Sequence, residues 1–233
     1  MERFFENVTV EASGDGYCVL LDAQPIKTPA KASLDIPTKA LAEAIAEEWE
    51  SQTQKIDPAS MPLMQAAATA IDRISTQRQK VIDDIVAYGG TDLVCYRVTY
   101  PKSLVVKQSA AWDPVLRWIE TRHNVELKIT NDISHVGQNS DALQRIAKIV
   151  SEQEDMTLAP LYNITALCGS LVIALAVLDG HMSAEEAFEA SEIDETHTME
   201  EWGEDAEALE RRKNNKNSLI ASVRFLELCG VIA

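Results

Sequence analysis

The sequence LAPLYNITALCGSLVIALAVL, residues 158–178, is the one long apolar run in the chain. Its length would suit a helix that spans a bilayer, so a membrane segment has to be considered first. However, the run contains polar residues and is flanked by acids rather than by the Lys or Arg residues that anchor membrane helices. A helix that is apolar on every side can also be the buried centre of a large helical domain. We therefore predict a central core helix with Pro160 in its first turn and Gly180 as its C-terminal cap, and no membrane insertion.

The composition is that of a folded protein with an acidic surface. Of the 233 residues, 46% are hydrophobic and 25% are charged, which excludes a wholly disordered chain. The formal net charge of -16 argues against nucleic acid and anionic membrane as partners, because both bind basic surfaces.

Cysteine spacing and the first residues bear on the compartment. The four cysteines lie far apart without a C-x-x-C pair, so we expect free thiols in a reducing compartment rather than disulfides or a zinc site. The opening MERFFENVTV has neither a signal-peptide pattern nor a transit-peptide pattern. These features predict a soluble cytoplasmic protein.

The N-terminal part predicts a small antiparallel sheet covered by one helix. Residues 7–36 form short alternating segments separated by turn residues, which is typical of a β-meander. Thr38 can then cap a helix in which Leu41, Ile45 and Trp49 repeat every four residues and face the core. The acidic residues of this helix are expected to point outward: Glu43, Glu47 and Glu48.

The remainder predicts helices. Residues 55–60 have the composition of a connector, so we place a domain boundary there, with an α+β domain at 1–58 and an all-helical domain at 59–233. A helical apolar stripe follows and stops at Gly89-Gly90. The predicted fold class is therefore α+β, a small N-terminal β-meander with one covering helix followed by a larger all-α domain built around the central apolar helix.

Two capping boxes mark helices near the C-terminus. Ser183 and Glu186 open a short helix, and Thr198 and Glu201 are expected to open a long one that continues to Gly230. The familiar phosphate-loop, dinucleotide, zinc-protease and nucleophile-elbow motifs are absent from the sequence, and the four histidines share no metal-ligand spacing. We therefore expect no enzyme activity, no cofactor and no bound metal.

Charge is segregated in the last quarter of the chain. Twelve acidic residues and no Lys or Arg lie between His181 and Glu210, and four basic residues follow by position 216. The simplest explanation is a solvated helix whose charges complement its dipole. The alternative is a protein-binding site, because Trp202 lies among the carboxylates and a helix would place Glu201 and Asp205 on one side of it. The same two carboxylates could also act as an acid/base pair in a hydrolase.

The sequence resembles the assembly chaperones of mitochondrial-type ATP synthase that bind the unassembled alpha subunit of its catalytic head. The resemblance runs along nearly the whole chain, in the order LDAQPIKTPAKASLDIPTKALAEAIAEEWESQ (21–52), IDPASMPLMQAAATAIDR (56–73), YGGTDLVCYR (88–97), WDPVLRW (112–118) and EEWGEDAEALERR (200–212). It implies a small N-terminal α+β domain, a larger helical domain and a non-enzymatic role without a small-molecule substrate. In that role the chaperone keeps the alpha subunit from aggregating until the beta subunit displaces it.

The resemblance also assigns a site and a location. The family's acidic partner-binding patch falls on Glu201, Trp202, Glu204 and Asp205, and eukaryotic relatives are implied to work in the mitochondrial matrix, whereas this chain has a bacterial-type start. A scaffold that binds a different partner through the same patch remains the alternative. The chain departs from the family where residues 213–217, KNNKN, replace an Ala-rich continuation, and this predicts a weak or broken point in the last helix.

Overall fold

The computed structural model describes residues 1–132, 134–203 and 205–232. The chain forms two compact units. The first contains Met1–Arg78, Glu154–Pro160 and Arg224–Ala233, and the second contains Gln79–Gln153 and Leu161–Val223. Compactness does not show which segments fold on their own, so the domain boundary expected after residue 58 stays a prediction.

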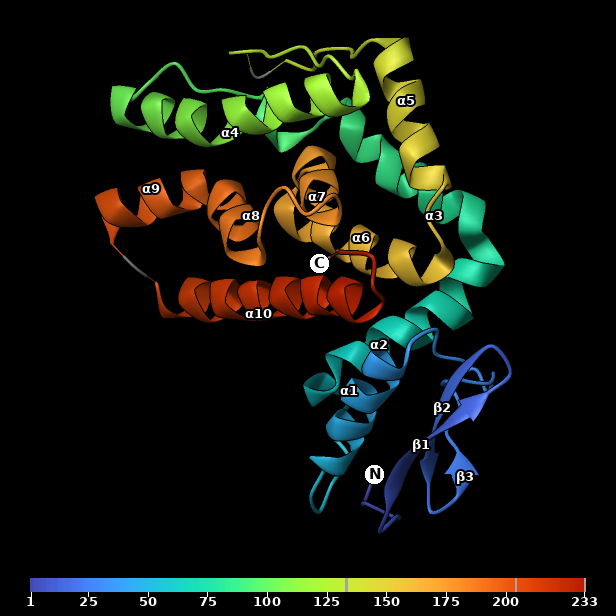
Figure 1. Cartoon of the computed structure of the whole chain (residues 1–233). Helices are drawn as coiled ribbons and strands as arrows, with labels where there is room; N and C mark the ends of the chain where they lie inside the picture. Colours follow the sequence, from blue (N-terminus) through green and yellow to red (C-terminus); the bar gives the residue numbers. More distant parts are fainter. Residues whose placement is uncertain (133, 204, 233) are drawn as a thin grey trace. The chain divides into compact units, whose positions relative to one another are not determined.

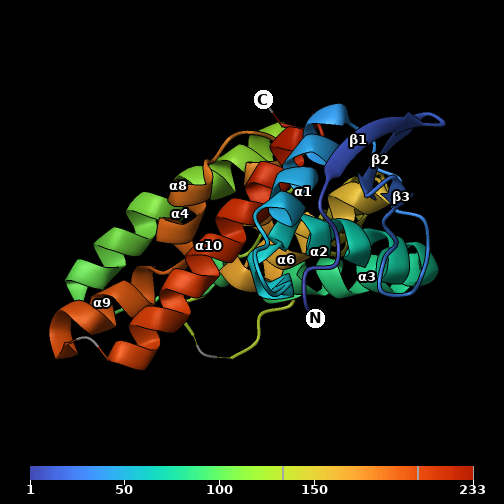
Figure 2. The same cartoon turned by 90° about the horizontal axis from the view of Figure 1, so that it is seen from below.

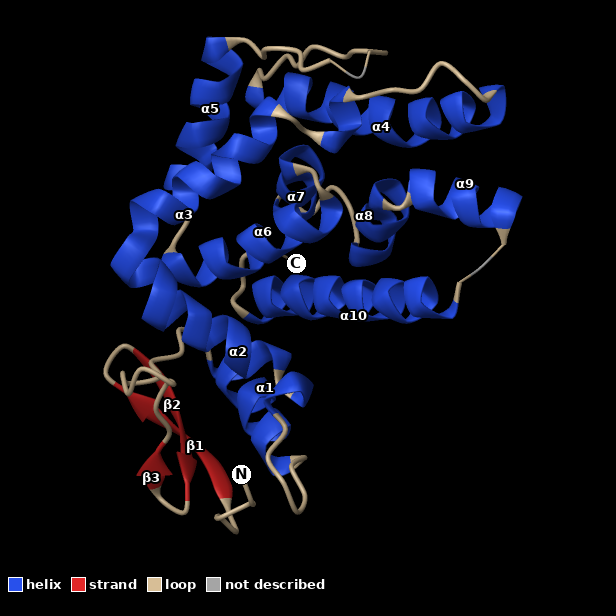
Figure 3. Ribbon diagram, turned by 180° about the vertical axis from the view of Figure 1, so that it is seen from behind, coloured by secondary structure: helices blue, strands red, loops and turns tan. Residues whose placement is uncertain are grey.

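The first unit contains the sheet and the helix that covers it. Three antiparallel strands lie in sequence order: β1 (Val8–Ser13), β2 (Gly16–Leu21) and β3 (Gln24–Pro25). Helix α1 (Lys39–Glu50) packs on β1 and β2, as Figure 3 shows. This confirms the predicted meander with one covering helix.

Helices make up most of the rest of the chain (Figure 1). Their bounds are α2 (Pro62–Thr69), a π-helical turn (Ala70–Ile74), α3 (Ser75–Ala87), α4 (Lys102–His123), α5 (Ser140–Ser151), α6 (Asp155–Cys168), α7 (Leu171–Leu178), α8 (Ala184–Ser191), α9 (Ile193–Trp202) and α10 (Ala206–Leu228).

Helix α1 begins as the sequence predicts. The Thr38 hydroxyl accepts a hydrogen bond from the Leu41 N–H at 3.2 Å, which satisfies one of the free donors at the start of the helix. Leu41 and Ile45 are fully buried beneath the sheet, so the four-residue repeat does mark the core face.

The end of α1 contains the Glu-Glu-Trp segment at residues 47–49. Glu48 was expected to point outward, and this is wrong: its carboxylate accepts hydrogen bonds from the Leu63 and Met64 N–H groups, each at 2.8 Å, and so caps α2. Trp49 packs edge-to-face on Phe5 with 5.8 Å between ring centroids, and it belongs to the core rim as predicted. The segment therefore joins α1 to α2 and to the N-terminal strand region.

The apolar run is two helices rather than one. Gly169 has a positive φ of 60°, which ends α6, and the Ser170 hydroxyl accepts a hydrogen bond from the Ile173 N–H at 3.0 Å, which starts α7. Because α6 begins at Asp155, Pro160 lies inside the helix and not in its first turn, so that expectation is wrong. Gly180, with a positive φ, does follow the end of α7 as predicted.

Burial of this run agrees with the core assignment. All residues of α7 from Leu171 to Val177 are buried, which explains why no amphipathic period is visible in the sequence. Within the described part of the chain, no helix is both long enough and apolar enough to cross a membrane.

Candidate partner-binding site

The site expected at the C-terminal acidic segment lies at a junction between two helices. Helix α9 ends at Trp202, and Gly203 follows with φ 92° and ψ 171°, a backbone conformation that is essentially restricted to glycine. Thr198 does not cap the long helix, as the sequence suggested. It lies inside α9, where its hydroxyl donates to the Asp194 carbonyl at 2.9 Å.

The four predicted site residues are therefore divided by this turn. Glu201 and Trp202 end α9, whereas Asp205 precedes α10 and accepts a hydrogen bond from the Ala208 N–H at 3.0 Å, which caps that helix. Glu204 lies outside the described residues. The expectation that Glu201 and Asp205 share one helical face is wrong, and the proposed acid/base pair thereby loses the geometry on which it depended.

Trp202 is the most exposed large apolar side chain at this junction. Its exposed fraction is 87%, whereas Trp112 in the same unit is fully buried and donates its indole N–H to the Ala190 carbonyl at 2.7 Å. An indole that contributes nothing to the core leaves apolar surface in contact with water, which is unfavourable in the isolated chain. Exposed tryptophans at such positions are typical anchors of protein interfaces.

The helix ends around Trp202 contain further exposed apolar residues. Figures 1 and 2 both show the start of α4, the end of α9 and the start of α10 gathered there. Tyr100 precedes α4 and is 81% exposed, Val106 in its first turns is 67% exposed, and Leu209 in the first turn of α10 is 39% exposed. We call these three residues, with Trp202, Glu201 and Asp205, the helix-end surface.

Helix α9 is braced from the side of α4. The Lys107 ammonium pairs with the Glu200 carboxylate at 2.5 Å, and this hydrogen bond is the main cause of the lowered pKa of Glu200. At the start of α9, the Gln108 amide donates to the Asp194 carboxylate at 2.7 Å. These contacts fix the two helices in register, so the end of α9 that carries Trp202 has a defined position.

Arg212 braces α9 from the side of α10. Its guanidinium contacts the Glu192 carboxylate at 3.1 Å and the Thr196 hydroxyl at 2.5 Å, and it lies 5.6 Å from the centroid of the Phe188 ring. The planar fork of an arginine suits this combination of ion pair, hydrogen bond and ring contact. Sequence reasoning identified the basic cluster only as a complement to the helix dipole and missed this role.

The basic cluster also continues the last helix. Residues 213–217 lie within α10, which is unbroken from Ala206 to Leu228, so the predicted break is wrong. Lys216 lies 5.7 Å from the Phe188 ring centroid, and the buried Leu219 packs one turn later. Tertiary packing therefore overrides the poor helix propensity of the asparagines.

The described residues offer little reactive chemistry. They contain no group of three or more His, Cys, Asp or Glu side chains placed to hold a metal. Burial raises the pKa of the Cys95 and Cys168 thiols to about 12, so neither is a thiolate at neutral pH.

Known proteins resemble this chain over nearly its whole length. The family model described as ATP12 chaperone protein matches residues 2–120. The protein named atp12, mitochondrial, from Schizosaccharomyces pombe is 21% identical over 240 aligned residues, covering 97% of this chain and 82% of that protein. The crystal structure of Atp12 from Paracoccus denitrificans is 37% identical, superposes with a TM-score of 0.94 and covers 98% of each chain. A mutant of Paracoccus denitrificans Atp12p gives the same TM-score and identity.

The predicted fold class is confirmed, because the chain has a three-stranded antiparallel N-terminal sheet followed by a mostly helical body and matches these structures. The chaperone class expected from the sequence is likewise supported. The family match covers more than half of the chain, and we conclude that this protein belongs to the ATP12 chaperone protein family, whose members act as chaperones in ATP synthase assembly.

Proposed function

We propose that this protein binds the unassembled alpha subunit of the ATP synthase catalytic head and prevents its aggregation until the beta subunit displaces it. Family membership supports the chaperone class and the assembly pathway. The alpha subunit and the displacement step come from the resemblance of the sequence. The cytoplasmic location expected from the sequence stays a prediction, and the Schizosaccharomyces pombe relative is named as mitochondrial.

The exposure of Trp202 is the observation that carries the proposal. Its indole is 87% exposed on a helix end that Lys107 and Arg212 brace from two sides. A rigid, exposed aromatic loses little conformational entropy on binding, so most of its burial contributes to affinity. Glu201 and Asp205 lie on either side of the turn and would select a client surface that carries basic groups.

The mechanism requires shielding rather than catalysis. A subunit that awaits its neighbour exposes an apolar face larger than those of stable monomers, and such a face aggregates. The helix-end surface would cover part of that face through Tyr100, Val106, Trp202 and Leu209. A contact made by these few side chains would be smaller than a permanent subunit interface, so the beta subunit could replace it without nucleotide hydrolysis by the chaperone.

Light scattering of purified alpha subunit, with and without this protein, tests the proposal. Trp202→Ala should weaken suppression of aggregation about tenfold or more, since interface tryptophans are often worth roughly 2 kcal/mol or more. Ile129→Ala is the matched control, because Ile129 is also an exposed apolar residue of the helical unit, at 51%, but lies outside the helix-end surface.

Charge is tested separately. Glu201→Lys reverses one carboxylate, and Asp205→Asn removes the charge of the other while keeping a side chain that can cap α10. Both should weaken alpha-subunit binding, more strongly at low salt. If Trp202→Ala and Glu201→Lys suppress aggregation as well as the unmodified protein while circular dichroism is unchanged, the helix-end surface is not the binding site. Co-purification of a different protein would instead favour the scaffold alternative.

A further inference from the structure

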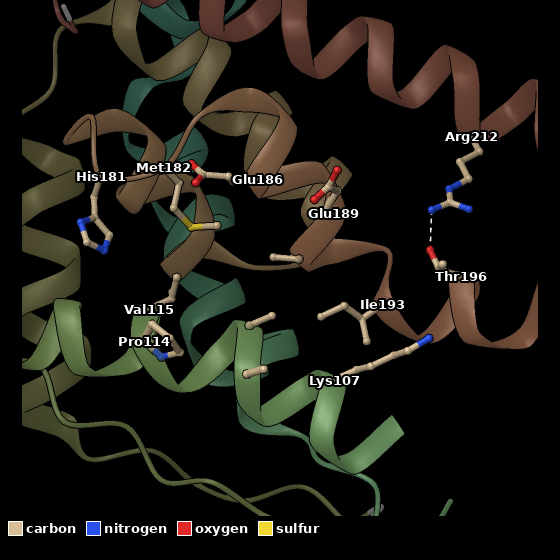
Figure 4. Close-up of a pocket in the computed structure, with 13 residues that line it drawn as sticks. Lys107, Pro114, Val115, His181, Met182, Glu186, Glu189, Ile193, Thr196 and Arg212 are labelled. Atoms are coloured by element: carbon tan, nitrogen blue, oxygen red, sulfur yellow. Dashed lines mark hydrogen bonds between the residues drawn. The ribbon is translucent and has the colours of Figure 1, made fainter. Parts of the chain in front are cut away.

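A groove runs beside α4 in the helical unit, next to the helix-end surface and distinct from it. Its volume is about 820 Å³, and it is lined by α4 on one side and by the segment from His181 through α8 and α9 on the other. Figure 4 shows Pro114 and Val115 of α4 opposite Met182, with Ile193 farther along the groove near Lys107. Alanine residues of α4 and α8 complete the apolar lining: Ala110, Ala111 and Ala190.

Charges around this groove do not cancel. The two cations on its rim already have partners, since Lys107 pairs with Glu200 and Arg212 pairs with Glu192. Glu189 has no ion-pair partner among the residues that the structure describes, and it lies on the exposed side of α8.

Glu186 also lies on the groove and stays ionised. The Ser183 N–H donates to its carboxylate at 2.8 Å, and this bond lowers the pKa of Glu186. Because α8 places Glu186 and Glu189 three residues apart, both carboxylates are on one face of the helix. An apolar groove with an anionic edge is therefore open to an occupant that is apolar on one side and basic beside it.

The length of the groove fits a helix. Its wall on α4 extends from Lys107 to Val115, which is roughly 12 Å at about 1.5 Å per helical residue. The anchors of a helix bound in a groove recur at i, i+3 or i+4, and i+7, and they span about 10 Å.

We propose that this groove binds an amphipathic helical segment of the client protein, with apolar side chains in the groove and Lys or Arg beside Glu186 and Glu189. The inference rests on the proposed function, because it assigns the groove to the same client. Two lining residues connect the groove to the helix-end surface. Lys107 belongs to α4, which braces α9, and Thr196 belongs to α9, which carries Trp202. The client segment bound there can thus continue from the part covered by the helix-end surface.

A designed peptide tests the groove without the alpha subunit. The probe is a fluorescein-labelled helix of about 18 residues with Leu at the groove-facing positions and Lys at the flanking positions, and a second peptide carries Glu in place of Lys. Binding is measured by fluorescence anisotropy. We expect the Lys peptide to bind and the Glu peptide to bind at least about tenfold more weakly, since like charges would meet Glu186 and Glu189.

Two variants and a control locate the binding. Ala110→Trp fills the groove from α4 and should weaken the Lys peptide about tenfold or more. Glu189→Lys should weaken it about fivefold. Glu126→Lys is the control, because it makes the same charge change at an exposed position of the helical unit that does not line the groove. The control also keeps the net charge equal to that of Glu189→Lys, so a general attraction between a basic peptide and an acidic protein would affect both equally.

Several results would overturn the inference. Equal affinity for the Lys and Glu peptides, equal loss in Glu126→Lys and Glu189→Lys, or full binding to Ala110→Trp would each exclude the groove as a basic-helix site. Dimerisation in sedimentation experiments that Ala110→Trp abolishes would identify a second copy of this chain as the occupant instead. Failure of the unmodified protein to bind the alpha subunit, with peptide binding intact, would contradict the proposed function and leave the groove's preference established.

Discussion

Replacing Asp92 by alanine should destabilise the helical unit more than any comparable surface change. Asp92 is completely buried, and its carboxylate accepts hydrogen bonds from the Val94 N–H at 3.2 Å and the Val172 N–H at 3.0 Å. It also bonds the Ser170 hydroxyl, so one side chain joins the loop after α3 to the first turn of α7. Alanine at this position would leave these donors buried without a partner.

The magnitude follows from those bonds. A buried donor that loses its partner costs about 1–3 kcal/mol, and the two backbone N–H groups cannot turn toward water. We therefore expect Asp92→Ala to lower the free energy of unfolding by about 3–5 kcal/mol, a large part of the stability of a typical domain. Urea unfolding followed by circular dichroism measures this loss. Asp57→Ala is the control, because Asp57 accepts a hydrogen bond from the Ala59 N–H at 3.0 Å in an exposed turn, and it should cost about 1 kcal/mol or less.

Burial of Asp92 also predicts a pH dependence. Desolvation raises its pKa from 3.8 to about 6 in the folded protein, whereas the unfolded chain ionises near the ordinary value. Between these values the folded state holds a proton that the unfolded state has lost, so the free energy of unfolding falls as pH rises from about 4 to about 6. A shift of about two pH units corresponds to roughly 3 kcal/mol.

Asp92→Asn removes this titration. As pH rises from about 4 to about 7, the unfolding free energy of the unmodified protein should therefore fall relative to that of Asp92→Asn. A difference that stays constant across that range, or an Asp92→Ala loss no larger than that of Asp57→Ala, would refute the assignment of Asp92 as a buried link between the loop and α7.

Three further predictions follow from single contacts. Arg212→Ala should lower the free energy of unfolding, measured in urea, by about 1–3 kcal/mol, because Glu192 and Thr196 lose their partner. It should also weaken alpha-subunit binding, although Trp202 is unchanged. Lys213→Ala at the neighbouring exposed position should change neither quantity. Gly169→Ala should lower the thermal unfolding midpoint, because a side chain at this left-handed φ costs about 1–2 kcal/mol. An unchanged midpoint would show that the break between α6 and α7 does not require glycine. Glu48→Ala should cost about 1–3 kcal/mol because two N–H groups of α2 lose their acceptor, while Glu47→Ala on the exposed face should stay within about 0.5 kcal/mol.

Local chemistry explains what could be predicted from the sequence. Thr38 before an apolar repeat and the Ser183–Glu186 pair each cap a helix within three residues, so their partners are fixed by the chain itself. The alternation in the first strands and the repeat of Leu41 and Ile45 define the faces that must be buried together. The resemblance of the sequence added the family, and it supplied the still untested expectation that Trp202 belongs to a partner-binding site.

Other predictions failed because local sequence does not show a partner distant in the chain. Thr198 has the pattern of a helix start, but the helix already runs through it, because Gln108 and Arg212 hold the preceding turn in place. Glu48 looks like a solvent-facing acid until α2 brings its N–H groups to it.

The sequence by itself determined the elements that local capping and one-sided burial specify: the meander, its covering helix, the capping box before α8 and the buried character of residues 158–178. Only the tertiary structure decided that this run is two helices, because residues buried on every side show no period that separates one helix from two. It also decided that Glu201 and Asp205 lie on different helices, since Gly203 breaks the register between them. Those choices depend on free donors, charges and apolar faces supplied by parts of the chain that only folding brings together.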